Sequence, residues 1–99
     1  MQYFESHING KKPVVVDFYA DWCRPCTLMG PVLEEVKAKV GGRATILKMN
    51  IDKNPHHTQL YGIRSVPTLA IFKEGNLVWR QSGVTPAHEI LKHLQLLIP

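Results

Sequence analysis

The pattern of apolar and polar residues along the chain predicts strands that alternate with helices. Val14–Tyr19 is apolar on both faces apart from one carboxylate, as is typical of a central strand covered on both sides. Ala44–Asn50 is predicted to be a second strand. Two further strands, Pro67–Phe72 and Leu77–Gln81, flank the tetrapeptide Lys73-Glu74-Gly75-Asn76, which is typical of a hairpin turn.

Four segments are predicted to be helical. A short helix over Tyr3–Asn9 would end at a glycine, and a longer one over Arg24–Val40 has apolar residues at helical spacing. Pro31 should kink this longer helix, because it removes an amide donor and crowds the preceding turn. Pro55–Tyr61 follows an Asn-Pro pair, and the last helix follows Thr85-Pro86, so each has a capping residue before a proline. The apolar face of the last helix would consist of Ile90, Leu91, Leu94, Leu97 and Ile98.

This order of elements predicts an α/β fold. The strand–helix–strand unit implies parallel strands with a right-handed connection, whereas the hairpin implies antiparallel ones. We therefore expect a central mixed sheet of about four strands, flanked by helices on both faces. The length of 99 residues suits a single domain over residues 1–99.

Charge and hydropathy narrow the function classes. The formal net charge is +4, but the basic residues are scattered among acidic ones, so we expect no nucleic-acid partner. No apolar run approaches the roughly 18 residues that a membrane span needs. No signal peptide is visible at the N-terminus, which favours a cytoplasmic location and leaves an exported form open.

The candidate chemistry lies in the run Trp22-Cys23-Arg24-Pro25-Cys26, which contains both cysteines of the chain. Two cysteines at this spacing, between a strand and a helix, are typical of a dithiol–disulfide redox centre. The alternatives are a pair of buried thiols or half of a zinc site, which would need two further ligands. Four histidines, His56, His57, His88 and His93, are expected to be exposed, and His7 has no suitable partner either, so no metal is predicted.

The two cysteines are expected to have different roles. Cys23 at the start of the helix would be the nucleophile, because unpaired backbone amides and the helix dipole favour a thiolate. Cys26, one turn further on, would be more buried and would resolve the mixed disulfide with the help of a base. Asp17 is the candidate base, since it is the charged residue of its strand and burial should raise its pKa. The alternative is a structural aspartate.

Four stretches of the chain resemble thioredoxins. They are Val15-Val16-Asp17-Phe18-Tyr19-Ala20-Asp21-Trp22-Cys23-Arg24-Pro25-Cys26, Asn50-Ile51-Asp52-Lys53-Asn54-Pro55, Tyr61-Gly62-Ile63-Arg64-Ser65-Val66-Pro67-Thr68 and Phe72-Lys73-Glu74-Gly75. The resemblance implies the thioredoxin fold and a thiol–disulfide oxidoreductase that reduces protein disulfides through its Cys23–Cys26 disulfide, without a bound cofactor. It also implies a flavin- and NADPH-dependent thioredoxin reductase as partner.

The resemblance further assigns residues around the two cysteines. Asp17 would be the proton-shuttling carboxylate, with Lys48 near it, and Pro25 would restrain the loop. Pro67 would follow a cis peptide bond and present the Val66 backbone to substrate. An apolar rim for partner proteins would consist of Trp22, Ile51, Val66, Gly83 and Val84. Core packing is the alternative for Ile51 and Val84, and a surface lysine is the alternative for Lys48.

The sequence departs from the family in three places. Arg24 replaces a glycine between the cysteines, and a charge that stabilises the thiolate should make the centre more oxidising. Ser65 also stands where glycine is usual. The N-terminal strand of the family is shortened or missing, so Ala44–Asn50 would be an edge strand of the sheet. We expect a monomer, and the exposed edge would allow a weak dimer. Rival functions are an exported oxidase, isomerase or cytochrome-maturation reductase, and a non-enzymatic docking module.

Overall fold

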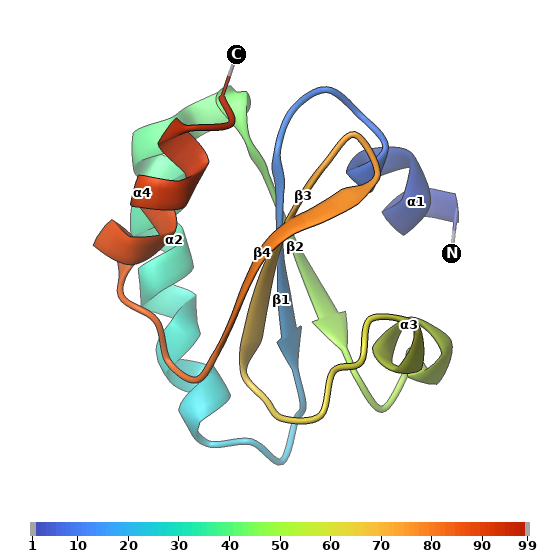
Figure 1. Ribbon diagram of the computed structural model, residues 1–99. Helices are drawn as coiled ribbons and strands as arrows, with labels where there is room; N and C mark the ends of the chain where they lie inside the picture. The colour runs from blue at the N-terminus through green and yellow to red at the C-terminus, as the bar shows by residue number, and fades with distance from the viewer. Residues whose placement is uncertain (1, 99) are drawn as a thin grey trace.

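The computed structural model describes residues 2–98 and places a four-stranded sheet between two layers of helices (Figure 1). The elements are α1 (Gln2–Ile8), β1 (Val14–Tyr19), the 3₁₀ turn η1 (Pro25–Leu28), α2 (Met29–Val40), the 3₁₀ turn η2 (Gly41–Arg43), β2 (Thr45–Asn50), α3 (Pro55–Leu60), β3 (Thr68–Lys73), β4 (Asn76–Ser82) and α4 (Ala87–Gln95). No helix in this part of the chain is both long and apolar enough to span a bilayer.

The sheet has the strand order β2-β1-β3-β4 and mixes parallel with antiparallel pairs. β1 pairs in parallel with β2, as the helical crossover between them requires, and antiparallel with β3. β3 and β4 form the antiparallel hairpin. The predicted mixed sheet is therefore confirmed, and among the described strands β2 and β4 are the edges.

The alternation of side chains along β1 divides the core into two layers. Val15 packs with buried residues of α2 and α4, such as Val36 and Leu94. Val16 and Phe18 belong to the opposite layer, which includes Phe4 of α1. Figure 1 shows α2 and α4 on one face of the sheet and α1 and α3 on the other. By the same alternation, Asp17 lies on the face that α2 covers.

The prediction of a single helix over Arg24–Val40 was wrong in one respect. The structure has a 3₁₀ turn over Pro25–Leu28, and α2 begins at Met29. Because Pro31 has no amide hydrogen, it cannot make the α-helical bond to the carbonyl four residues earlier, and the preceding turn winds more tightly. Pro31 consequently stands in the first turn of α2, where a missing donor is tolerated.

The predicted cap at Thr85 was also wrong. α4 begins at Ala87 with Pro86 as its N-cap residue, and Pro86 has an extended backbone (φ −72°, ψ 155°). The Thr85 hydroxyl instead donates to the Gly83 carbonyl at 3.1 Å. The segment before α4 is thereby tied into a local turn next to the candidate site.

The hairpin turn between β3 and β4 matches its prediction. Glu74 and Gly75 both have positive φ angles, 51° and 84°, as a two-residue turn of this kind requires. The Gly75 amide donates to the Ile8 carbonyl at 2.7 Å, and the Glu74 amide donates to the Gly10 carbonyl at 3.2 Å. These bonds fasten the turn to the end of α1.

Candidate active site

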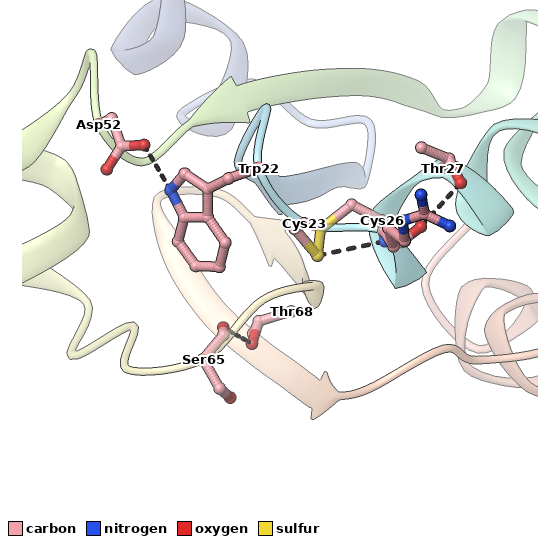
Figure 2. Close-up of a disulfide and its surroundings, with 8 residues drawn as sticks. Trp22, Cys23, Cys26, Thr27, Asp52, Ser65 and Thr68 are labelled. Carbon is pink, nitrogen blue, oxygen red and sulfur yellow. Dashed lines mark hydrogen bonds between the residues drawn. A yellow bond between two sulfur atoms is a disulfide. The ribbon is translucent and has the colours of Figure 1, made fainter.

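The two cysteines lie just beyond the carboxyl end of β1 and form a disulfide with a Cα–Cα distance of 5.4 Å. The Cys26 amide donates to the Cys23 sulfur at 3.2 Å (Figure 2), and the Cys23 amide donates to the Ala20 carbonyl at 3.2 Å. An amide hydrogen aimed at a sulfur stabilises the thiolate over the thiol. The fold thus supplies Cys23 with a donor from the turn that begins at Pro25.

The expectation that Cys26 is the more buried cysteine was wrong. The exposed fractions are 6% for Cys23 and 8% for Cys26. Cys23 is covered because it packs in a small apolar cluster with Ala20 and Cys26, against which Ile51 and Val66 are packed. Both sulfurs therefore belong to one apolar patch.

Asp17, in the strand β1 that leads to the cysteines, is buried with an exposed fraction of 1%. Its Oδ1 atom has no hydrogen-bond partner among the described residues. Burial raises the pKa of Asp17 to about 6, and the positive charge of Lys48 opposes that rise. Lys48 is the residue paired with Asp17 across the β1–β2 ladder, and its ammonium lies 4.8 Å from the centroid of the Tyr19 ring. The structure therefore brings Asp17 and Lys48 together.

A pocket of about 190 Å³ connects the disulfide with Lys48. A cavity of this size and polarity has room for water, which can carry a proton between groups that do not touch. Its lining residues are Tyr19, Ala20, Asp21, Cys23, Cys26, Thr27 and Lys48.

Trp22 is exposed beside the disulfide, with 68% of its surface accessible. Its indole nitrogen donates to Asp52 Oδ2 at 2.9 Å, and Figure 2 shows the indole nitrogen pointing toward that carboxylate. The buried Asn50 side chain holds the Asp52 loop, because its Oδ1 accepts hydrogen bonds from the Asp52 and Lys53 amides at 2.9 and 3.2 Å. Sequence reasoning missed Asp52 as a site residue; the stretch Asn50–Pro55 shared with the family was the available signal.

The rest of the predicted rim gathers around Pro67. The Val66–Pro67 peptide bond is cis, the geometry that the resemblance implied. The Gly83 amide donates to the Pro67 carbonyl at 2.8 Å, and Gly83 has a φ of 92°, which a side chain would strain. Ser65 is exposed, and its carbonyl accepts the Thr68 hydroxyl at 2.7 Å (Figure 2). Val84 follows Gly83 and is also exposed.

The expectation of exposed histidines was wrong for His57 and His93. His57 is only 5% exposed, because α3 turns it inward onto Phe4, with ring centroids 4.9 Å apart. Its Nε2 atom lies 3.5 Å from a carboxylate oxygen of Glu5. His93 is half-buried and stacks on Trp79. Among residues 2–98, no group of three or more His, Cys, Asp or Glu side chains is arranged to hold a metal ion.

Comparison with known proteins gives a consistent result. The family model for thioredoxin matches residues 1–96. A thioredoxin from Alicyclobacillus acidocaldarius is 45% identical over 87 residues, which cover 88% of this chain and 83% of the relative. Thioredoxin 2 from Chlorobaculum tepidum is 45% identical over 94 residues, which cover 94% of this chain and 86% of the relative.

Similarity extends to solved structures. A mutant thioredoxin from Halobacterium salinarum superposes with a TM-score of 0.88 at 28% identity, covering all of this chain and 86% of that one. The family model, the relatives and the solved structure all point to the same family. The chain therefore belongs to the thioredoxin family.

Proposed function

We propose that Cys23 and Cys26 have distinct roles in the exchange reaction by which this thiol–disulfide oxidoreductase reduces protein disulfides. The Cys23 thiolate attacks one sulfur of the substrate disulfide, forms a mixed disulfide and releases the first substrate thiolate. The Cys26 thiolate then attacks the Cys23 sulfur, closes the intramolecular disulfide and releases the second. Two electrons pass from the dithiol to the substrate, and no bound cofactor takes part.

The hydrogen bond from the Cys26 amide to the Cys23 sulfur carries this proposal. It supplies positive partial charge to Cys23 and none to Cys26, so the two thiols differ in how readily they ionise. Cys26, in contrast, needs a base at the moment when it attacks. We assign that role to Asp17, which takes the Cys26 proton through water; the pocket lined by Cys26 extends to Lys48, the residue paired with Asp17 across the β1–β2 ladder.

A pKa of about 6 suits Asp17 to this role, because general bases work best when their pKa lies near the operating pH. An ordinary exposed aspartate would accept a proton less readily. Lys48 acts as a positioning residue, since its charge favours the ionised form of Asp17 before the proton arrives.

The exposed rim is the proposed docking surface for substrate proteins. Trp22 and Val84 are exposed, whereas Ile51 and Val66 pack against the cysteines. An extended substrate segment would pair with the Val66 backbone beside the cis peptide bond. Members of the family act on disulfide substrates and are regenerated by a reductase; we propose a flavin- and NADPH-dependent reductase, a monomeric state and a cytoplasmic location for this chain.

Two serine variants test these roles. Cys26→Ser should accumulate a mixed disulfide with a substrate such as insulin, because the resolving thiol is gone, and mass spectrometry would detect it. Cys23→Ser should form no such adduct and should not reduce insulin. Equal trapping by both variants, or trapping by Cys23→Ser alone, contradicts the assignment.

Arg24 gives specific support to a second candidate, disulfide formation or shuffling. The arginine is exposed and adjacent to Cys23, so its charge stabilises the thiolate and favours the reduced form. Equilibration against dithiothreitol or glutathione buffers separates the candidates. A reduction potential near −270 mV supports a reductase of a reducing compartment, whereas roughly −180 to −120 mV supports an exported isomerase or oxidase. Arg24→Gly should lower the potential; an unchanged value removes the argument from Arg24.

A further inference from the structure

We propose that a hollow beside the disulfide is an additional substrate subsite that favours polypeptide segments with acidic side chains. This hollow, named the Arg24 hollow, has a volume of about 550 Å³ and is lined by Arg24, Pro25, Thr27 and Leu28. The inference rests on the proposed function, since the occupant is part of a disulfide substrate. The subsite would add a preference for negatively charged substrate segments, which the apolar rim cannot supply.

The hollow combines one free charge with an apolar surface. The Arg24 guanidinium is exposed and makes no hydrogen bond or ion pair within residues 2–98. It is the charged group of the hollow, and a guanidinium binds a carboxylate through two parallel hydrogen bonds. Leu28 is 59% exposed although it belongs to the turn that leads into α2, so it offers apolar area beside the charge.

The backbone of the residues that line the hollow is held by local hydrogen bonds. The Thr27 hydroxyl donates to the Arg24 carbonyl at 2.7 Å (Figure 2), and the Thr27 amide donates to the same oxygen at 3.0 Å. Pro25 fixes its own φ angle between them. Little backbone freedom remains to be lost when a segment binds, so the binding cost is confined to ordering the exposed Arg24 and Leu28 side chains.

The hollow is continuous with the reactive centre. Thr27 lines both the Arg24 hollow and the pocket that contains the two cysteine sulfurs. A substrate segment that occupies the hollow therefore lies next to the pocket in which Cys23 attacks the substrate disulfide. The acceptor for Arg24 would be a carboxylate within a few residues of the substrate cystine.

The charges around the disulfide would orient an acidic segment in this subsite. Asp21 lines the neighbouring pocket together with Lys48, and Asp52 accepts the hydrogen bond of the Trp22 indole, so two carboxylates lie near the disulfide outside the hollow. The Arg24 hollow contains no acidic residue. An acidic segment is attracted at the hollow and repelled at Asp21 and Asp52, which orients it. The net charge of +4 adds attraction at long range.

The test uses three disulfide-linked peptides of equal length that differ only in the two residues after cysteine: Glu-Glu, Gln-Gln or Lys-Lys. The protein is reduced beforehand and mixed with excess peptide, and the second-order rate constant is measured by stopped flow. The neutral disulfide of 2-mercaptoethanol serves as reference, because it reports thiolate reactivity without filling the subsite. Each peptide rate is divided by the reference rate for the same variant.

The wild type should react faster with the Glu-Glu peptide than with the Lys-Lys peptide. Arg24→Gln should reduce that ratio about two- to fivefold, the range that one exposed ion pair provides, and 0.5 M salt should do the same. Leu28→Ser should slow all three peptides relative to the reference and preserve the ratio. Lys92→Gln removes one exposed charge from α4 and should leave the ratio unchanged.

Three results would overturn the subsite: a wild type with no preference for the acidic peptide, a ratio unchanged by Arg24→Gln, or an equal change in Lys92→Gln, which would indicate net charge alone. Failure of the proposed function looks different. In that case the reduced wild type would react with none of the peptides and not with the reference disulfide.

Discussion

Replacement of Asp17 by asparagine should stabilise the folded protein at neutral pH. The aspartate is 1% exposed, and one of its oxygens has no hydrogen-bond partner among the described residues, so its ionised form is poorly solvated. Its pKa is about 6 in the folded state against an ordinary value of 3.8. At 1.36 kcal/mol per pKa unit, this difference corresponds to about 3 kcal/mol of lost stability once the group is ionised. Asparagine has a similar shape and carries no charge.

The sign of the pH dependence follows from the raised pKa. Between pH 3.8 and about 6 the folded protein binds more protons at Asp17 than the unfolded chain does. The contribution of Asp17 to stability is therefore intact below pH 3.8 and is lost as the pH rises through about 6. The stability gained by Asp17→Asn should be close to zero near pH 3.5 and about 3 kcal/mol at pH 7 and above.

Urea unfolding of the oxidised proteins from pH 3.5 to 8 measures this difference directly. Asp21→Asn is the matched control, because Asp21 is exposed and such a surface change should alter stability by no more than about 0.5 kcal/mol. A gain in Asp17→Asn that is independent of pH would refute the argument from ionisation. A loss of stability at pH 7 would show that the carboxylate has stabilising partners.

Three further predictions concern residues around the site and its support. Lys48→Met should raise the pKa of Asp17 above about 6, because the opposing charge is removed; carboxyl ¹³C NMR titration measures this, and a lower pKa contradicts it. Gly75→Ala should lower the free energy of unfolding in urea by roughly 1–2 kcal/mol, because φ is +84° and a Cβ would lie 2.7 Å from Asn9 Oδ1. Gly42→Ala is the control and should be near neutral, because a Cβ there has no atom within 4 Å. Phe4→Ala should cost about 3–5 kcal/mol by losing its packing on His57 and leaving a cavity, and a loss below about 1 kcal/mol would show that α1 contributes little.

Segments with a strong local signal could be predicted from sequence. β1 was predicted with its observed bounds, because an apolar run of six residues with one carboxylate fits a strand buried on both faces. The hairpin turn was also recognised, from the tetrapeptide Lys73-Glu74-Gly75-Asn76 between two strands, and the structure shows Glu74 and Gly75 with positive φ angles there. Helix starts were less certain: the 3₁₀ turn before Met29 and the start of α4 at Ala87 depend on hydrogen bonds that composition does not specify.

The site residues, too, fall into those that the sequence indicated and those that it did not. The spacing of Cys23 and Cys26 placed them on one turn, where they form the disulfide. The single carboxylate in β1 singled out Asp17, and the structure shows it to be buried as expected. The hydrogen bond between Trp22 and Asp52 was not found, because its partners are 30 residues apart. The inward position of His57 was not found either, since a short helix has too few residues to show which face is buried.

The sequence by itself determined the identity of the reactive groups and the order of the elements, because both depend on interactions between residues close together in the chain. Only the tertiary structure decided how those groups are tuned. The raised pKa of Asp17, the opposing charge of Lys48 and the similar burial of the two cysteines arise where β1, β2 and the turn before α2 meet. Desolvation and charge interactions act through space, so the chain must fold before either can shift a pKa.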